Sequence, residues 1–397
     1  MAQRQKFYGD QMEESRENSM KKEGVFQFEK RDSQGTRVTP VSCEKFDFER
    51  YVDYEESLKE RQKRFLEADE GILVYRRVRA DGVFYDKCRD WKESLELQLG
   101  ALEKSLEYQA DLANFLEPWY GIGYIAGCFG GKYEFLEGQA PAVRPVFHST
   151  EELLAAAPEK IENTPAGKHI LEMTEYFMDK TKGKLPVSLT DVQSPINMLS
   201  YLLPITDLFM EVYDDPDGVK EAAMLSAKLL AEFLNKQRMI IGDALAAPGH
   251  GFASSRLFRG IGLSDDNSIM IAEEDYKELF QPADEWLGEQ FGGTVFHSCG
   301  NWEQKISMVK QMNGIFMADG AFTIQTDPSP NTPDAFAEKF AGSGIILNAR
   351  AVGAEAGNTF ERLYRKGMKL IAVTYCETAK EQEELYRKLH EMEYHLK

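Results

Sequence analysis

A chain of 397 residues can hold two domains or one large α/β barrel, and 43% hydrophobic residues with 24 phenylalanines suffice for a buried core. The formal net charge of −19 argues against a nucleic-acid partner, because such binding needs clustered lysine and arginine. The polar start is unlike a secretory signal, and no window offers the roughly 18 apolar residues of a membrane helix. Five cysteines, an odd number, predict reduced thiols in the cytoplasm rather than a disulfide framework.

The first hundred or so residues give the weakest structural patterns. The expected elements are a charged helix over 8–22, strands at 25–28 and 37–41, and helices over 54–68 and 91–115. A turn at 32–35 would join the two strands into a hairpin, with Pro40 confining the second strand to a sheet edge. We therefore predict an N-terminal extension, residues 1–113, that packs on the rest of the chain.

From residue 114 onward, short apolar strands alternate with amphipathic helices. Strands are expected at 185–190, 260–266, 294–299, 314–319, 344–349 and 369–376, and helices at 149–157, 164–182, 219–239, 273–291, 303–312, 332–341, 359–366 and 379–395. Alternation with short connections is typical of parallel βα units. The length fits a (β/α)8 barrel, also called a TIM barrel, so we predict a barrel catalytic domain over residues 114–397.

Polar side chains stand at or just beyond the C-terminal ends of the expected strands. They are Asp191, Asp265, Asp266, His297, Cys299, Asp319, Asn348 and Cys376. In a barrel these strand ends converge on one mouth, where active sites form. This placement favours a closed barrel over an open doubly wound sheet, which shows the same alternation.

The most informative segment is Thr294–Gly300, with the sequence Thr-Val-Phe-His-Ser-Cys-Gly. Alternate residues of a strand share a face, so His297 and Cys299 are expected to point the same way. An imidazole and a thiolate on one side form half of a tetrahedral zinc site. The best candidate for a third ligand is Cys376, at the end of the last expected strand. The alternative is a buried polar pair with an unrelated buried thiol.

Other residues are weaker candidates. Glu117 and Asp191 are candidate catalytic residues that could orient a substrate or supply a fourth ligand, although a cap or turn suits Asp191 equally well. The candidate substrate-binding residues are Asp265, Asp319, Asn348 and Tyr375, and a solvated loop is an alternative for the pair Asp265-Asp266. The remaining cysteines and histidines are expected at core or surface positions without a functional role. They are Cys43, Cys88, Cys128, His148, His169, His250, His390 and His395.

Three groups of residues carry a resemblance to a known family. They are Val295-Phe296-His297-Ser298-Cys299-Gly300-Asn301, then Cys376, and Asp191-x-x-x-Pro195 followed by Tyr213-Asp214-Asp215-Pro216. From about Asn114 to the C-terminus the chain resembles the uroporphyrinogen decarboxylase superfamily. Within it, the His-x-Cys-Gly run is similar to that of the zinc-dependent corrinoid methyltransferases, such as the methanol- and methylamine-linked coenzyme M methyltransferases. The arginine-rich substrate motif of the decarboxylase itself is not recognised.

The resemblance implies a (β/α)8 barrel that holds Zn²⁺ through His297, Cys299 and Cys376. It also implies transfer of a methyl group, in either direction, between a corrinoid on a separate partner protein and a small thiol or methyl donor. Two thiolates and an imidazole would leave one zinc position open, where a bound thiol loses its proton to become a strong nucleophile. Because no Asp-x-His-x-x-Gly run offers a histidine to cobalt, we expect the corrinoid to belong to the partner.

We expect the partner to dock on exposed rim loops formed by the glycine-rich run Tyr120–Gly131 and the segment Ala246–Gly262. Two alternatives from other classes remain. One is a metal-independent decarboxylase of the same fold. The other is a non-enzymatic protein that binds zinc or a corrinoid partner.

Overall fold

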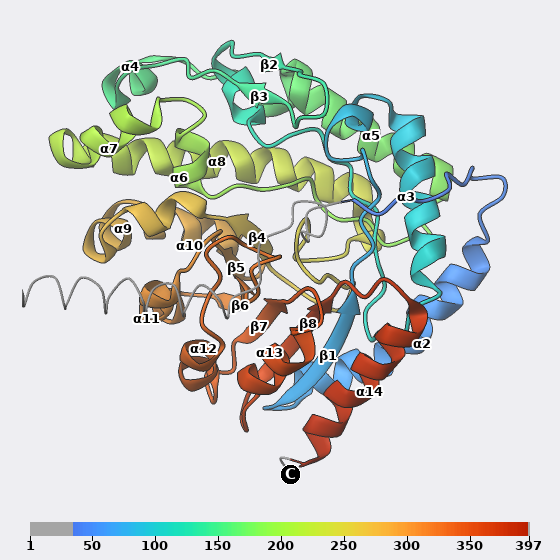
Figure 1. The fold of residues 1–397 in the computed structure, drawn as a ribbon. Helices are drawn as coiled ribbons and strands as arrows, with labels where there is room; N and C mark the ends of the chain where they lie inside the picture. The colour runs from blue at the N-terminus through green and yellow to red at the C-terminus, as the bar shows by residue number, and fades with distance from the viewer. Residues whose placement is uncertain (1–34, 396–397) are drawn as a thin grey trace, which may run out of the picture.

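A curved parallel sheet forms the centre of the computed structural model, which describes residues 35–395 (Figure 1). Its strands are β1 (Gly71–Arg76), β4 (Ile261–Ser264), β5 (Thr294–His297), β6 (Ile315–Ala321), β7 (Ile346–Arg350) and β8 (Lys369–Thr374). They are hydrogen-bonded in the order β1-β8-β7-β6-β5-β4, and every pair is parallel. Because all strands are parallel, their C-terminal ends lie at one end of the sheet.

An extended segment, residues 111–117, continues the ring from β1. The backbone N–H of Asp111 donates to the carbonyl of Val74 in β1. Further along, Leu116 forms an isolated parallel bridge with Val187. This segment therefore forms a wall of the ring without a regular ladder of hydrogen bonds.

A second extended segment, residues 185–194, completes the ring at β4. Val187 bridges Leu245, and Gln193 bridges Ser264 of β4, both in the parallel sense. Six regular strands and two irregular segments make up the eight walls of a (β/α)8 barrel. The predicted fold class is confirmed.

Helices surround the barrel (Figure 1). The α-helices are α2 (Phe48–Glu67), α3 (Trp91–Ser105), α4 (Thr150–Ala155), α5 (Pro165–Thr181), α6 (Pro195–Leu199), α7 (Ile205–Asp214), α8 (Pro216–Ile241), α9 (Glu273–Leu279), α10 (Gln281–Glu289), α11 (Ile306–Gln311), α12 (Pro333–Phe340), α13 (Ala356–Leu363) and α14 (Ala379–His395). The 3-10 helices are η2 (Asp86–Arg89), η3 (Tyr124–Phe129), η4 (Ile161–Asn163), η5 (Gly242–Ala244), η6 (Asp266–Met270) and η7 (Glu303–Lys305), and β2 (Tyr133–Glu134) pairs antiparallel with β3 (Ala142–Val143). No helix in the described part of the chain has the length and apolar character needed to span a membrane.

Local sequence explains where helices begin and break. At the start of α8, the carboxylate of Asp215 accepts the N–H of Gly218 at 3.1 Å, and Pro216 occupies the first helical position, where no N–H is needed. The single helix expected over 273–291 is two helices, α9 and α10. Pro282 has no N–H to continue the hydrogen bonds of α9, so the chain starts a new helix there.

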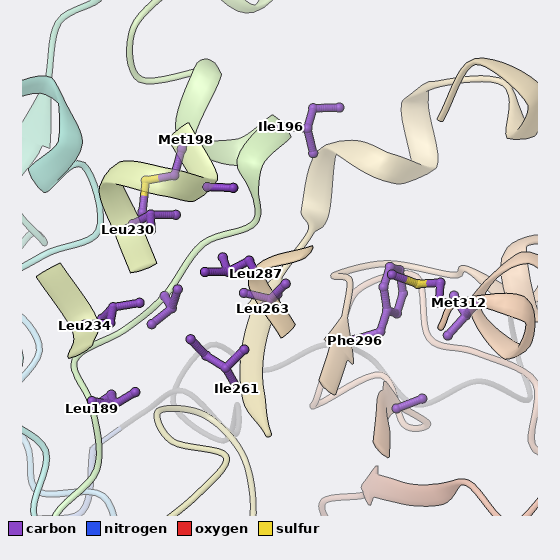
Figure 2. Close-up of a cluster of buried hydrophobic side chains, with 14 of the residues drawn as sticks. Leu189, Ile196, Met198, Leu230, Leu234, Ile261, Leu263, Leu287, Phe296 and Met312 are labelled. Carbon is purple, nitrogen blue, oxygen red and sulfur yellow. The ribbon is translucent and has the colours of Figure 1, made fainter. Parts of the chain in front are cut away.

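The core has an inner layer inside the barrel and an outer layer between the barrel and its helices. The strands are buried on both faces, as in other parallel sheets, and alternate residues serve the two layers. The inner layer includes Leu73, Tyr75, Val295, Met317, Ile346, Ile371 and Val373. Figure 2 shows part of the outer layer, with Leu189, Ile196, Met198, Leu230, Leu234, Ile261, Leu263, Leu287, Phe296 and Met312 labelled.

The domain boundary expected after residue 113 is wrong, because the barrel begins at β1. Every residue of Gly71–Arg76 is buried, and β1 pairs with β8 from Gly71–Lys369 onward. A continuous apolar run without alternation is typical of a strand buried on both faces, and this run went unrecognised in the sequence. The helix expected over 91–115 accordingly ends at Ser105, since residues 111–117 belong to the barrel wall.

The remaining N-terminal predictions have mixed outcomes. The helix over 8–22 and the strand at 25–28 lie outside the described residues. The segment 37–41 is not a strand; near it, only an isolated bridge joins Thr36 to Ala80. It packs along α3 instead, where the N–H of Val41 donates to the carbonyl of Glu96.

Asp111, which is 1% exposed, joins three parts of the fold. Its carboxylate accepts the N–H of Val74 at 2.8 Å and the hydroxyl of Tyr386 at 2.7 Å. It also lies 3.0 Å from Nε2 of His390 and 3.0 Å from Nε of Arg61. Figure 1 shows α2, which carries Arg61, and α14 side by side next to β1.

Replacing Asp111 with alanine should lower the free energy of unfolding by about 3–5 kcal/mol, the range for removing one partner of a buried ion pair. The N–H of Val74 would lose its acceptor, and Arg61 would lose one of its two carboxylate partners and keep Glu393 at 3.2 Å. Chemical denaturation measures the change. Glu56→Ala is the control, because Glu56 pairs with Lys59 on the surface and its loss should cost about 1 kcal/mol or less. Equal effects of the two substitutions would contradict this role for Asp111.

Candidate metal centre

β5 ends at His297 in the barrel mouth, and Cys299 follows two residues later. Nε2 of His297 lies 3.5 Å from Sγ of Cys299. The structure therefore confirms that these two side chains point the same way. Cys299 is exposed, whereas the His297 side chain is only 14% exposed.

The third member of the group is Asp266, the first residue of η6. Strand β4 lies beside β5 with Ser264 opposite His297, and this register places Asp266 next to Cys299. Oδ1 of Asp266 accepts the N–H of Cys299 at 2.7 Å and lies 3.6 Å from Nε2 of His297. Among the described residues, Asp266, His297 and Cys299 each offer one ligand atom, and these atoms lie within 4.8 Å of one another. We call these three residues the metal-ligand group.

The metal-ligand group fits zinc by chemistry and by spacing. A carboxylate oxygen, an imidazole nitrogen and a thiolate sulfur are the three ligand types that zinc takes in proteins. With bonds of about 2.0–2.3 Å, neighbouring ligands of a tetrahedral zinc stand roughly 3.3–3.8 Å apart. The separations of 3.5 Å and 3.6 Å from Nε2 of His297 fall in that range, and the Asp266 oxygen and Cys299 sulfur lie within 4.8 Å of each other. Three protein ligands with one free position is the arrangement of catalytic zinc sites.

Asp319 of β6 fixes the orientation of His297. Its Oδ2 lies 2.6 Å from Nδ1 of His297, so Nε2 faces the metal-ligand group. Nε of Arg350 donates to the same oxygen at 3.0 Å, and the amide of Asn348 donates to Oδ1 at 2.5 Å. Histidine ligands of metals almost always have such a carboxylate or carbonyl partner on the other ring nitrogen.

The pKa shifts of Asp319 and His297 agree with their close contact. Burial alone would raise the pKa of Asp319, but Arg350 and His297 outweigh it and lower that pKa to about 2. Burial alone would lower the pKa of His297, but Asp319 and Cys299 raise it well above its usual value. Metal binding at Nε2 must then displace a proton, so it should weaken as the pH falls.

Cys376, the predicted third ligand, lies two residues beyond β8. It is at the same end of the barrel as His297, but β6 and β7 separate β8 from β5. Its carbonyl accepts Nε of Arg76 at 2.9 Å, and burial raises the pKa of its thiol. Among the described residues the structure brings Asp266, rather than Cys376, to His297 and Cys299. Zinc ligation by Cys376 stays a prediction, and Asp266 is a candidate ligand that the sequence analysis missed.

A second polar cluster lies where the two irregular walls of the barrel end. Glu117 is the last residue of the wall segment 111–117, and Asp191 lies within the segment 185–194. Nδ1 of His250 stands 2.5 Å from Oε2 of Glu117, and Nε2 stands 3.2 Å from Oδ2 of Asp191. We call Glu117, His250 and Asp191 the acid–histidine cluster. It brings together both candidate catalytic residues, neither of which lies in the metal-ligand group.

From the sequence, His250 is given no functional role because no partner is found for this residue. That premise is wrong, since two carboxylates face the imidazole. Its neighbours Gly249 and Gly251 have φ angles of +119° and +84°, in the region that favours glycine. This turn carries the imidazole to two carboxylates that are far away in the sequence. The glycines on both sides of His250 were the available signal.

Asp265 is buried behind the metal-ligand group, so the solvated-loop alternative is wrong for it. It accepts the hydroxyl of Ser194 at 3.0 Å and the hydroxyl of Tyr276, and its N–H donates to the carbonyl of His297 at 2.7 Å. Burial raises the pKa of Asp265 to about 7. The ring of Tyr375 packs against the inner core of the barrel. Substrate contact by Asp265, Asp319, Asn348 and Tyr375 stays a prediction, and the first three make hydrogen bonds within the chain.

The two segments expected as exposed rim loops are mostly buried. In Tyr120–Gly131, η3 packs into the outer core, and in Ala246–Gly262 the ring of Phe252 enters the inner core. A Cβ on Gly262 would stand 2.1 Å from that ring. The glycines here permit close packing rather than loop exposure. Phe252 also lies beside the metal-ligand group, with its ring centroid 6.1 Å from that of His297.

Three arginines, Arg76, Arg77 and Arg79, stand at the C-terminal end of β1, a feature that the sequence analysis did not use. Nη1 of Arg77 donates to the carbonyl of Gly251 at 3.4 Å, next to His250. The guanidinium groups of the other two lie over aromatic rings, Arg76 at 4.5 Å from Tyr108 and Arg79 at 3.8 Å from Phe84. These cations therefore contact the chain's own groups around the mouth.

Comparisons with known proteins agree with this architecture. Residues 68–247 match the model of the uroporphyrinogen decarboxylase (URO-D) family. The match starts just before β1 and ends before the metal-ligand group. A solved structure of a methyltransferase from Methanosarcina mazei has a TM-score of 0.57 and 12% sequence identity, covering 93% of this chain and 95% of that one. At this identity the likeness concerns the fold. No curated protein sequence matches the chain.

The match and the shared fold agree with the resemblance seen in the sequence. The matched region supplies the first walls of the barrel, and the Methanosarcina mazei structure follows the chain over nearly its full length. Residues 68–247 therefore resemble the uroporphyrinogen decarboxylase family, and the chain as a whole shares its fold with the Methanosarcina mazei methyltransferase.

Proposed function

We propose that this protein is a zinc-dependent methyltransferase that moves a methyl group between a corrinoid on a separate protein and a small thiol or methyl donor. The observation that carries the proposal is the metal-ligand group at the barrel mouth, with His297 oriented by Asp319. The superfamily includes the corrinoid methyltransferases that the sequence resembles, and the Methanosarcina mazei protein of the same fold is named a methyltransferase. A cytoplasmic location is part of the proposal.

In this proposal His297, Cys299 and Asp266 hold the metal. Bound zinc acts as a Lewis acid and lowers the pKa of a thiol, or polarises the oxygen or nitrogen of a methyl donor. Asp319 keeps Nε2 of His297 directed at the metal position. Phe252, which is 3% exposed, lies beside the imidazole ring and keeps water from that side.

The alternative of a metal-independent decarboxylase draws support from the family match, but it gives the metal-ligand group no role. The three arginines at the end of β1 also make contacts within the chain, at the carbonyl groups of Cys376 and Gly251 and at two aromatic rings. In a non-enzymatic zinc protein, the other alternative, a fourth ligand from the protein would fill the coordination position that the methyltransferase leaves open. Thiol binding to a cobalt-substituted sample, seen as a change in the visible spectrum, tests for an open position.

The zinc content of ligand variants tests the site itself. We expect about one zinc per chain in the wild type and loss of most of it in Cys299→Ala. Comparing Asp266→Ala with Cys376→Ala identifies the third ligand. We expect the larger loss from Asp266→Ala, because its oxygen already lies 3.6 Å from Nε2 of His297.

Cys43→Ala serves as the matched control, since Cys43 is a half-buried thiol outside the metal-ligand group and should leave the zinc content unchanged. Retention of zinc by Cys299→Ala and Asp266→Ala together would rule out this site. Loss in Cys376→Ala instead of Asp266→Ala would restore the ligand set implied by the sequence resemblance.

A further inference from the structure

The acid–histidine cluster places an imidazole between two carboxyl groups, one facing each ring nitrogen. Both ring nitrogens of His250 face carboxylate oxygens, at 2.5 Å from Glu117 and 3.2 Å from Asp191. A neutral imidazole has only one N–H, so its other nitrogen would present a lone pair to a negative oxygen. An extra proton removes that repulsion, and it resides on His250 or on one of the acids.

Hydrogen-bond donors and cations face both acids. Asp191 also accepts the indole N–H of Trp119 at 3.1 Å and the amide of Gln193 at 2.9 Å. Burial alone would raise the pKa of Glu117, but His250, followed by Arg77 and Arg79, lowers it below its usual value. The imidazole bridges both acids, so it can take a proton from one carboxyl group and pass it on.

Three segments of the chain contribute the neighbours of His250. Glu117 and Trp119 come from the first irregular wall, and Asp191 comes from the second. The segment after β1 contributes the charges of Arg77 and Arg79 and the ring of Phe84, which lies 5.0 Å from the imidazole between centroids. His250 remains 13% exposed, so its proton is not sealed from the mouth.

The acid–histidine cluster and the metal-ligand group belong to the same mouth. Phe252, two residues after His250, contacts the ring of His297. The next residue, Ala253, donates its N–H to Asn348, which in turn donates to Asp319. The pKa of Tyr201 is raised, first by burial and then by two carboxylates. Asp191 belongs to the acid–histidine cluster, and Asp266 belongs to the metal-ligand group. The hydroxyl of Tyr201 thus lies within the field of both groups.

We propose that His250 is the acid that protonates the group left behind when a methyl donor loses its methyl group. The proposal rests on the proposed function and gives it a direction. In the step, the bond from the methyl carbon to oxygen or nitrogen breaks, and a carbon–cobalt bond forms with the electron pair of a Co(I) corrinoid. The departing oxygen or nitrogen takes the proton of His250, which regains one from water. A thiol acceptor would release a proton instead, so a proton donor at this position favours an O-methyl or N-methyl donor.

The test compares His250→Gln with wild type in single-turnover transfer to cob(I)alamin, followed by cobalt absorbance. The donors are methanol, trimethylamine and a series of anisoles whose phenols differ in acidity. General acid catalysis is worth roughly 10²–10⁴-fold. We expect His250→Gln to lose about that much with the most basic leaving groups and much less with nitroanisole, which needs little protonation. A steeper dependence on leaving-group pKa is an effect that a merely structural role would not produce.

His148→Gln is the control, because His148 is 80% exposed and pairs with Asp207 at the surface. If His250→Gln is poorly folded by circular dichroism, Glu117→Gln is measured in its place. Nitrogen NMR of the imidazole should show both ring nitrogens of His250 protonated at neutral pH in the wild type. A neutral ring, or equal rates for His250→Gln and His148→Gln with every donor, would overturn the assignment of His250 while leaving methyl transfer intact. If the wild type demethylates no donor, the proposed function fails and this inference fails with it.

Discussion

Replacing His297 with alanine is expected to slow methyl transfer by roughly 1,000-fold or more. A metal ion acting as a Lewis acid supplies several kcal/mol of transition-state stabilisation, and each 1.36 kcal/mol is tenfold in rate. His297 is the central ligand of the group, with Cys299 at 3.5 Å and Asp266 at 3.6 Å from its Nε2. Its removal would leave two ligands and should lower zinc occupancy as well as rate. Single-turnover kinetics with cobalt absorbance, together with metal analysis, measure both effects.

His148→Ala is the matched control for His297→Ala, because both remove an imidazole and His148 is a surface residue. We expect its rate and zinc content to equal those of the wild type. Docking of the corrinoid protein should survive in His297→Ala, since the substitution is small beside a protein–protein contact, and this can be measured by titration calorimetry. Wild-type rates in a His297→Ala protein that has lost its zinc would contradict a metal role in the reaction.

Removing the metal with a chelator is expected to abolish methyl transfer and leave the protein folded. A chain of 397 residues buries a core that does not depend on zinc, unlike small zinc domains that unfold without metal. The layers inside and outside the barrel are built from apolar side chains. Circular dichroism should therefore be unchanged after chelation, and activity should return when one equivalent of zinc is added.

Magnesium added to the chelated protein is the control, because its preference for oxygen ligands in octahedral geometry does not suit a thiolate and an imidazole. Activity that survives complete removal of the metal would favour the metal-independent alternative. Cooperative unfolding on chelation would instead favour a structural zinc site, since it would show that folding depends on the metal.

Much of the barrel could be predicted from the sequence, because alternation of strand and helix is a local pattern. The exceptions are its irregular parts. β1 has a continuous apolar run without periodicity, and the walls at 111–117 and 185–194 join their neighbours through isolated bridges. These segments depend on pairing with strands far away in the sequence, which no local pattern reports. The domain boundary was misplaced for this reason.

The candidate site could be predicted where its residues are close in the sequence. His297 and Cys299 stand two residues apart on one strand, and the structure places them together. Asp266 joins them only because β4 and β5 are neighbours in register, which required the three-dimensional arrangement. His250 was missed because its segment turns back into the barrel rather than lying on the rim. Periodicity and composition do not distinguish these two paths for a glycine-rich segment.

The central claim is that the metal-ligand group supports methyl transfer to or from a corrinoid, and the cobalt spectrum tests it most directly. The zinc-loaded protein would be mixed with corrinoid proteins encoded in the same genome, together with a panel of thiols and of O-methyl and N-methyl donors. The proposal predicts a change between Co(I) and methylated Co(III) absorbance with at least one combination, and no change with His297→Ala. If no corrinoid changes its methylation state while zinc occupies the site fully, the protein is not a corrinoid methyltransferase, and a zinc-binding role without catalysis replaces it.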